Sequence, residues 1–213
     1  MQRETTRPNF ITEQRLGGRV VGVDEVGRGP LAGPVVAAAV VFSLGVPDDL
    51  AGMINDSKKL RPSVRNRVAM LLPQIKGVEM ALGAASVREI DDLNILKATH
   101  LAMKRAVERL PTPPDYILVD GNIVPDFGVR YVGQTQAIIS GDSVSLSIAA
   151  ASIIAKVTRD RIMMRLAQRW PHYVWQKNAG YGTLAHRQAL KTRGISPHHR
   201  KTFSPIREIM CVK

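Results

Sequence analysis

The sequence contains a single cysteine, Cys211, among its 213 residues. One cysteine excludes an internal disulfide framework and a cysteine-rich zinc site, and it fits a reducing compartment. Long hydrophobic runs are also absent, because the longest, at 31–42, is interrupted by Gly33 and Pro34 and is too short to span a bilayer. The first ten residues lack the apolar core of a signal peptide. We therefore expect a cytoplasmic protein without a membrane partner.

The remaining composition is that of a globular chain. Hydrophobic residues make up 45% and charged residues 23%, which excludes a disordered chain. The length predicts one domain that buries its own core. Residues 1–17 are polar and show no periodicity, so we expect a flexible tail there and a single domain over 18–207.

Acidic residues are scarce in the last part of the chain. Residues 1–150 contain 17 Lys and Arg against 16 Asp and Glu, whereas residues 151–213 contain 13 against 2. Such a basic segment attracts a polyanion, either nucleic acid or an anionic membrane surface. A solubilising surface is the alternative, although such surfaces usually mix both signs. The charge therefore favours a nucleic-acid partner.

The hydrophobic pattern predicts a mixed α/β fold. Strands are expected at 19–24, 35–42, 78–85 and 116–119, with a further candidate at 129–132, and helices at 62–72, 94–110, 143–170 and 183–191. A short connection makes the first two strands antiparallel neighbours. The helix at 143–170 has a nearly apolar first half, and its second half is strongly basic.

Four acidic residues stand where predicted strands end or where the long helix begins. Asp24 and Glu25 follow a buried strand, Asp120 ends another, and Asp142 precedes the helix. Buried carboxylates are costly unless they are paired with cations, and a hard divalent metal with oxygen ligands is an economical partner. Carboxylates that converge on metal ions are typical of two-metal phosphoryl transfer.

Each of these acids also has a purely structural interpretation. Asp142 is well placed to cap the helix that follows it. Asp120 begins a D-G-N sequence that is typical of a turn. The adjacent pair Asp24 and Glu25 is harder to explain structurally, because neighbouring strand residues face opposite sides and one acid points into the interior.

Three loops carry residues suited to a sugar–phosphate chain. The backbone amides of Gly27, Arg28 and Gly29 are free to approach a sugar or phosphate closely. Ser57 and Lys58 offer a hydroxyl and an ammonium group to a phosphate, unless D-S-K-K-L is only a solvated basic turn. Tyr181 lies between two glycines and is suited to stacking on a sugar or base, or else packs within its own loop.

Together these segments resemble the ribonuclease HII family, the type 2 ribonucleases H, over most of the chain. The resemblance rests on V-G-V-D-E-V-G-R-G-P-L-A-G-P-V at 21–35, N-D-S-K-K-L at 55–60, N-I-L-K-A-T at 94–99, L-V-D-G at 118–121, G-D-S-V-S-L-S-I-A-A-A-S-I-I-A-K-V-T-R-D at 141–160 and G-Y-G-T-L-A-H at 180–186. The first and fifth of these motifs are long and highly specific.

The resemblance implies the ribonuclease H-like fold, a mixed five-stranded sheet flanked by helices with a helical C-terminal segment. It implies an endoribonuclease that cuts the RNA strand of RNA–DNA hybrids and single ribonucleotides embedded in duplex DNA, leaving 3′-hydroxyl and 5′-phosphate ends. Two Mg²⁺ or Mn²⁺ ions serve as cofactors in such an enzyme.

The resemblance also implies roles for single residues. The metal-binding acids are Asp24, Glu25, Asp120 and Asp142. The loop that reads the ribose 2′-hydroxyl is Gly27, Arg28 and Gly29, Tyr181 senses the RNA-to-DNA junction, and Ser57 and Lys58 contact a phosphate.

Two departures from the family pattern concern the C-terminal part. Ala179 stands where many members have lysine, and the nearest lysine, Lys177, is two residues earlier. The end of the chain, 205–213, lacks the glutamine and paired aromatics of a sliding-clamp-binding tail, so we expect no clamp binding through it. A monomer satisfies every feature. The competing interpretations are a non-catalytic nucleic-acid-binding module and another nuclease or transposase of the same fold.

Overall fold

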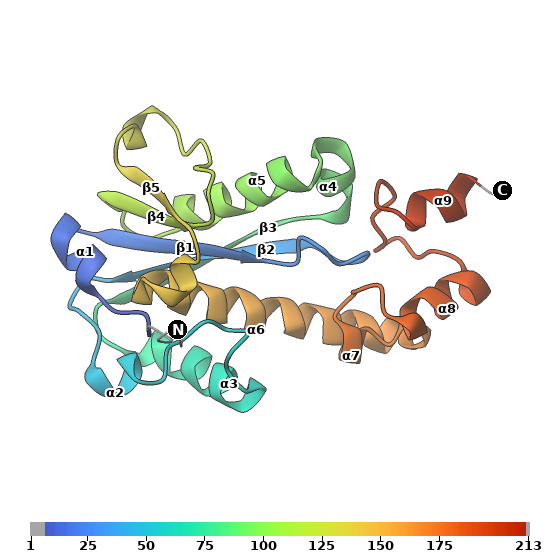
Figure 1. Ribbon diagram of the computed structural model, residues 1–213, viewed down its shortest axis with the longest axis horizontal. Coiled ribbons are helices and arrows are strands. Elements are labelled where there is room, and N and C mark those ends of the chain that lie inside the picture. The colour runs from blue at the N-terminus through green and yellow to red at the C-terminus, as the bar shows by residue number, and fades with distance from the viewer. Residues whose placement is uncertain (1–6, 212–213) are drawn as a thin grey trace, which may run out of the picture.

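A five-stranded mixed sheet forms the centre of the computed structural model, which describes residues 7–211 (Figure 1). Its strands, in the spatial order β3-β2-β1-β4-β5, are β1 (Val20–Val26), β2 (Val35–Phe42), β3 (Val78–Ala85), β4 (Tyr116–Asp120) and β5 (Thr135–Ile138). β1, β2 and β3 pair antiparallel, whereas β4 and β5 continue the sheet parallel to β1. The expected fold class, a mixed five-stranded sheet flanked by helices, is confirmed.

Helices cover both faces of the sheet (Figure 1). They are α1 (Ile11–Leu16), α2 (Asp48–Ala51), α3 (Pro62–Leu71), α4 (Val87–Leu93), α5 (Ile95–Glu108), α6 (Leu146–Arg169), α7 (Trp175–Asn178), α8 (Leu184–Arg193) and α9 (Ile206–Cys211). α4 and α5 lie on one face, and α6 lies on the other with α2 and α3 outside it. The last three helices extend beyond the sheet, at the C-terminal end of α6. Among residues 7–211, no helix combines the length and apolar character that a membrane span requires.

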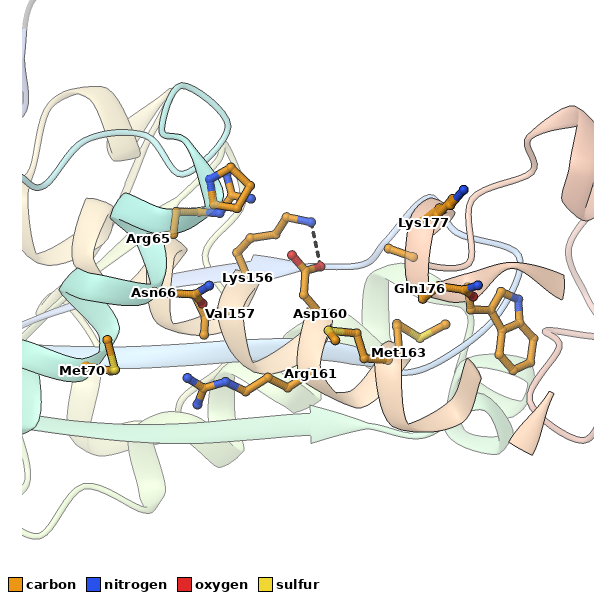
Figure 2. Close-up of a pocket in the computed structure, with 14 residues that line it drawn as sticks. Arg65, Asn66, Met70, Lys156, Val157, Asp160, Arg161, Met163, Gln176 and Lys177 are labelled. Carbon is orange, nitrogen blue, oxygen red and sulfur yellow. Dashed lines mark hydrogen bonds and ion pairs between the residues drawn. The ribbon is translucent and has the colours of Figure 1, made fainter. Parts of the chain in front are cut away.

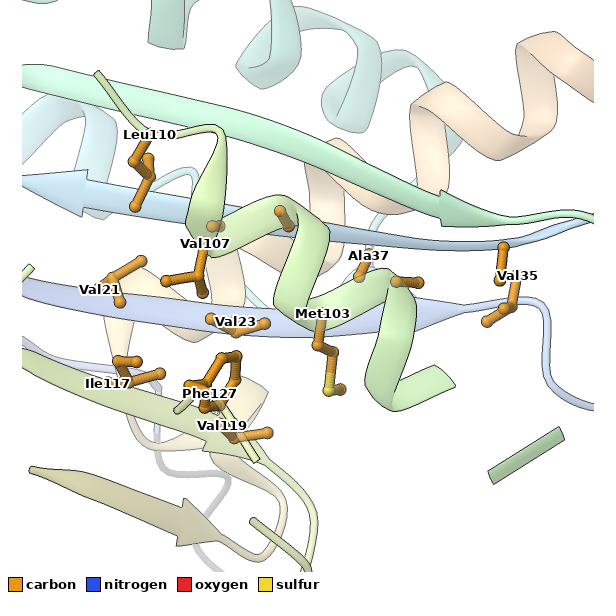
Figure 3. Packing of buried hydrophobic residues seen from close by; sticks show 14 of the residues in the cluster. Val21, Val23, Val35, Ala37, Met103, Val107, Leu110, Ile117, Val119 and Phe127 are labelled. Atoms are coloured by element: carbon orange, nitrogen blue, oxygen red, sulfur yellow. The ribbon is translucent and has the colours of Figure 1, made fainter. Parts of the chain in front are cut away.

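Two apolar layers hold the helices against the sheet. Figure 3 shows the layer under α5, where Val21, Val23 and Ala37 of the strands meet Met103 and Val107 of the helix. The second layer joins the opposite face of the sheet to the apolar half of α6. Burial of both layers is the main force that fixes the strand ends in space.

Glycine allows α5 to lie directly against β3. A Cβ atom on Gly83 would lie 2.0 Å from the backbone oxygen of Ala102, a distance that no side chain tolerates. The absence of a side chain at this position therefore sets how closely the helix packs.

Most predicted elements form close to their expected bounds, and the bounds of β2 and β3 are those predicted from the sequence. The candidate strand at 129–132 is wrong, because Val129–Tyr131 form a 3-10 helix and the sheet edge is β5 instead. The pairing of β5 with β4 is a tertiary contact, and the short T-Q-A-I sequence carries little periodicity.

Part of the segment 1–17, which was expected to be a flexible tail, is helical. Residues 1–6 lie outside the described residues, but Ile11–Leu16 form α1. Glu13 of α1 is buried, and its carboxylate accepts hydrogen bonds from Ser145 Oγ at 2.6 Å and from the Ser147 N–H at 3.0 Å. α1 is therefore docked on the start of α6, because a buried carboxylate meets free helix N–H groups there.

Candidate active site

The acids at the two central strand ends come together because β1 and β4 are parallel neighbours. Val23 pairs with Val119, so Asp24 and Asp120 follow at the same edge of the sheet. Glu25 is the next residue of β1, and Asp142 belongs to a 3-10 turn, Gly141–Ser143, that leads into α6. Two strands and one helix entrance thus supply the four predicted acids.

Short backbone contacts orient two of these carboxylates. The Glu25 N–H donates to Asp24 Oδ1 at 2.6 Å, and the Gly141 N–H donates to Asp120 Oδ1 at 2.7 Å. The second contact ties the end of β4 to the turn that carries Asp142. Both contacts leave the other oxygen of each carboxylate free of a described hydrogen-bond partner.

Asp142 does not cap the long helix. Ser145 occupies the N-cap position of α6, where its hydroxyl accepts a hydrogen bond from the Ile148 N–H at 3.2 Å. The capping interpretation of Asp142 is therefore wrong, because an extra 3-10 turn separates it from the helix. Its side chain is buried among other acids instead.

Mutual repulsion marks the four acids as a group. Burial raises the pKa of Asp24 well above its ordinary value, and the charges of Glu25, Asp120 and Asp142 raise it further. The pKa of Glu25 is also raised, chiefly by burial, although nearby Arg28 opposes the shift. For Asp142, burial together with Asp56 and Asp120 raises the pKa to about 6. Protein cations alone do not compensate this cluster.

The two cations nearest to the cluster lie at its rim. Arg28 Nη1 is 3.4 Å from Glu25 Oε1, and Lys58 Nζ is 3.9 Å from Asp142 Oδ2 with its side chain 83% exposed. Among residues 7–211, no group of three or more Asp, Glu, His or Cys side chains is close enough together to enclose a metal ion. The donor set is nonetheless oxygen-only, largely buried and mutually repelling, which fits a hard divalent cation that would draw the carboxylates together.

Asp56 belongs to this neighbourhood, and sequence reasoning missed it. It is buried, it contributes to the raised pKa of Asp142, and its Oδ1 accepts a hydrogen bond from the Lys58 N–H at 2.8 Å. Asp56 is the acid of the N-D-S-K-K-L motif, in which only Ser57 and Lys58 were predicted to be functional. Ser57 is itself buried, and its N–H donates to Ser152 Oγ of α6 at 3.3 Å.

The glycine loop after β1 lies beside the loop that carries Tyr181. A Cβ atom on Gly29 would lie 3.6 Å from Cε1 of the Tyr181 ring. Tyr181 is 47% exposed, so its ring is available to a ligand and is not packed within its own loop. The structure thus juxtaposes two predicted sugar-contacting elements that are more than 150 residues apart in the sequence.

A groove of about 700 Å³ runs along α6 between α3 and α7 (Figure 2). Basic side chains of three helices line it, namely Arg65, Lys156, Arg161 and Lys177. The one acid in its lining, Asp160, is paired with Lys156 at 2.8 Å. Figure 2 shows Lys156 and Lys177 on one side of the groove and Arg161 pointing away from them.

Sequence comparison identifies the family. A family model described as Ribonuclease HII matches residues 21–205. The chain belongs to the ribonuclease HII family. A ribonuclease HII of Granulibacter bethesdensis is 54% identical over 207 residues, covering 97% of this chain and 93% of that protein.

Solved structures of the family share the fold described above. Ribonuclease H2 from Pyrococcus horikoshii matches with a TM-score of 0.74 and 28% identity, over 90% of this chain and 96% of that one. The ribonuclease HII in a complex with PCNA from Archaeoglobus fulgidus matches with a TM-score of 0.72 and 26% identity, over 87% of this chain and 95% of that one. The chain is accordingly a metal-dependent endoribonuclease, a hydrolase of the ribonuclease H class.

Proposed function

We propose that this ribonuclease HII hydrolyses the RNA strand of RNA–DNA hybrids and also cuts on the 5′ side of single ribonucleotides embedded in duplex DNA. The products would carry 3′-hydroxyl and 5′-phosphate ends. The observation that carries the proposal is the convergence of four repelling acids at one sheet edge, where the Gly27–Gly29 loop also begins. The acids that would cleave the phosphodiester bond and the loop that would recognise the ribose would then lie in one site.

In this mechanism Asp24, Glu25, Asp120 and Asp142 would hold two divalent ions, Mg²⁺ or Mn²⁺. When bound, such ions supply an activated water and neutralise the charge that develops on the leaving oxygen. Asp24 is buried, and the charges of all three other acids raise its pKa, so we assign it the ligand position that both ions would share. The backbone donors to Asp24 and Asp120 keep those carboxylates oriented.

Recognition of ribose would fall to the two adjacent loops. The amides at Gly27, Arg28 and Gly29 are fixed by the fold and suit a 2′-hydroxyl, which is the group that distinguishes RNA from DNA at one nucleotide. The exposed ring of Tyr181 would stack on the next deoxyribose and thereby sense the junction.

Phosphate contacts would supply affinity without reading sequence. We assign them to Ser57, Lys58 and Lys177, of which Lys58 and Lys177 are exposed. Lys177 of α7 lines the groove and would take the contact that Ala179 cannot make. We further propose that the chain acts as a monomer in the cytoplasm, with residues 18–207 as its functional domain and without clamp binding through its C-terminal tail.

One cleavage assay tests the proposal. Three labelled duplexes are incubated with enzyme in Mg²⁺ or Mn²⁺: an RNA–DNA hybrid, a DNA duplex with one ribonucleotide, and an all-DNA duplex. We expect cleavage of the first two and none of the third, with product ends mapped by ligation. Asp24→Asn should abolish cleavage and retain hybrid binding, whereas Asp92→Asn, on exposed surface, should cut normally.

The same assay separates the alternatives. Retention of the hybrid without metal-dependent cleavage would indicate a binding module, and equal cleavage of the all-DNA duplex would indicate a different nuclease of this fold. Normal turnover by Asp24→Asn in Mg²⁺ would contradict the assigned site.

A further inference from the structure

Two arginine side chains, Arg159 of α6 and Arg200 after α8, are completely buried, with 0% exposure. Both lie where the 27–34 loop, the loop of Tyr181 and the 196–200 segment meet. Among residues 7–211, neither guanidinium pairs with a carboxylate. Burial of an unpaired charge is costly, so hydrogen bonds must compensate both groups.

Arg200 makes four side-chain hydrogen bonds, and all of them go to carbonyls of the 27–34 loop. Its Nη1 donates to the Arg28 carbonyl at 2.7 Å, and its Nη2 donates to the Gly27 carbonyl at 2.5 Å. Its Nε and Nη2 both donate to the Gly33 carbonyl, at 3.0 Å and 2.8 Å. One planar guanidinium therefore fixes both ends of the turn that carries Gly27–Gly29.

Arg159 connects the same loop to the segment that leads to Tyr181. Its Nε donates to the Pro34 carbonyl at 2.9 Å and its Nη2 to the Ala32 carbonyl at 3.0 Å. Its Nη1 donates to the Ala179 carbonyl at 2.9 Å. Gly27 has φ +96, and a Cβ atom there would lie 2.1 Å from Arg159 Nε. The guanidinium therefore fills the space beneath Gly27.

Backbone hydrogen bonds join the three segments in addition. The Leu31 N–H donates to the Gly180 carbonyl at 2.8 Å, and the Gly33 N–H donates to the His198 carbonyl at 2.9 Å. The Arg200 N–H donates to the Leu31 carbonyl at 2.9 Å. These bonds cross between segments, so none of the three can move without breaking contacts with the others.

We infer that Arg159 and Arg200 are positioning residues that hold the Gly27–Gly29 loop and the Tyr181 loop as one rigid unit. The inference rests on the proposed function, in which these two loops read one ribose and its 3′ neighbour. A fixed spacing between them would decide whether a lone ribonucleotide is recognised. Lysine cannot replace either residue, because its point-like ammonium lacks the planar fork that meets several carbonyls at once.

Burial lowers the pKa of Arg159 to about 10 and that of Arg200 to about 9. Both groups consequently remain protonated at neutral pH and keep all their donors. The positioning would therefore not change with pH in the physiological range.

The test compares two substrates within each variant. For Arg159→Lys and Arg200→Lys, kcat/KM is measured on a DNA duplex with one embedded ribonucleotide and on a hybrid with a continuous RNA strand. An inactive fraction lowers both values equally, so their ratio reports positioning alone. We expect the ratio of kcat/KM on the embedded ribonucleotide to kcat/KM on the hybrid to fall about tenfold or more. A small misplacement of a contact lowers the rate by up to about 100-fold, and a continuous RNA strand offers many alternative registers in which the enzyme can still cut.

Arg105→Lys is the matched control. Its Nη1 also donates to a backbone carbonyl, that of Ala84 at 2.8 Å, but on the α5 side of β3. This variant should lose stability and keep the wild-type ratio. An unchanged ratio in Arg159→Lys and Arg200→Lys would overturn the inference, whereas a wild-type enzyme that ignores embedded ribonucleotides would overturn the proposed function instead.

Hydrogen exchange of the wild-type protein decides the matter even if both lysine variants fail to fold. The backbone amides of Leu31, Gly33 and Arg200 should have similar protection factors, because the three segments would open together in one event. Protection factors that differ among them by more than about 100-fold would show independent segments and overturn the inference.

Discussion

At the scale of single residues, the burial of Asp24 determines the electrostatics of the site. The side chain is 6% exposed, and three other carboxylates raise its pKa in addition to the effect of burial. An acid whose pKa is raised in the folded state destabilises that state once it ionises. Without metal, the site is therefore a cost to folding stability.

We expect Asp24→Asn to raise the thermal unfolding midpoint of the metal-free protein at pH 7. Well below the ordinary pKa of 3.8 the Asp24 carboxyl is neutral in the folded and the unfolded state, so the gain should vanish in acid. The gain should grow as the pH rises above 3.8 and level off above the raised folded pKa. A gain of about 1 kcal/mol corresponds to about 2–4 °C for a domain of this size. Calorimetry in EDTA provides the measurement.

Addition of Mg²⁺ should reverse this order, because a ligand that binds only the folded state stabilises it. Wild type should gain stability with Mg²⁺, and Asp24→Asn should gain less. Asp92→Asn, a change at an exposed ion pair, controls for the loss of one negative charge. An Asp24→Asn protein that is less stable than wild type in EDTA would contradict the prediction.

Tyr181 is the second residue whose role can be isolated. Its exposed ring contributes little to the core, so Tyr181→Ala should leave the unfolding midpoint nearly unchanged. Cleavage at one embedded ribonucleotide should fall about tenfold or more, since stacking on a ring is worth about 1–3 kcal/mol. Tyr181→Phe should keep most of this activity if stacking dominates, and full activity of Tyr181→Ala would remove the residue from the site.

At the scale of elements, α6 organises the site by presenting different faces to different partners. Ser152 accepts the amide of Ser57, Arg159 holds the glycine loop, and Lys156 lines the groove. Arg165 is nine residues after Lys156, which places it about 180° around the helix. The basic second half of α6 therefore offers only part of its charge to a ligand in the groove.

This geometry predicts that Lys177 and Arg165 contribute differently to the binding of a hybrid. Lys177→Gln should weaken hybrid binding severalfold and reduce the slope of log affinity against log salt by about 1, because one phosphate contact is lost. Arg165→Gln removes an equal charge from a position outside the groove lining and should change the slope little. Titrations at several salt concentrations check both values, and equal effects of the two changes would contradict the proposed groove contact.

At the scale of the whole molecule, the C-terminal part is held together by neutral buried histidines. His186 Nε2 contacts His199 Nε2 at 3.0 Å, and His199 Nδ1 accepts the Ser196 N–H at 2.8 Å. Burial and the neighbouring His186 lower the pKa of His199 to about 3, and burial lowers that of His186. Folding therefore competes with protonation of these rings in acid.

The sign of the resulting pH dependence is determined by these shifts. The unfolded chain binds protons on both histidines below about pH 6.5, and the folded chain does not, so this contribution to stability is complete above that pH and is lost as the pH falls toward 3. Between pH 7 and 5 the stabilising contribution of the neutral histidine pair should therefore decrease, whereas the contribution of the buried acids Asp24 and Asp142 changes in the opposite direction. NMR should show His199 remaining neutral over this range, and a His199 titration near pH 6.5 would contradict the prediction. His172→Gln, outside the hydrogen bonds of this pair, should retain the acid sensitivity.

Much of the fold could be predicted from the sequence. Apolar runs predicted the bounds of β2 and β3, a helical spacing of apolar residues predicted nearly those of α5, and Gly194 marked the end of α8. The edge strand β5 and the docked helix α1 escaped prediction. Both depend on partners distant in the sequence: β4 for β5, and Ser145 and Ser147 for Glu13 of α1.

The candidate site divides in the same way. From the sequence alone we predicted the acids Asp24, Glu25, Asp120 and Asp142, because carboxylates at the ends of apolar strands are costly unless they are paired and because the resemblance to the family implies all four. Only the tertiary structure decided that Asp142 is no helix cap, that Asp56 lies beside it, and that Arg159 and Arg200 join the two loops that we propose contact the sugar. The partners of the two arginines are backbone carbonyls, which every residue possesses. No pattern of side chains in the sequence could therefore predict those contacts.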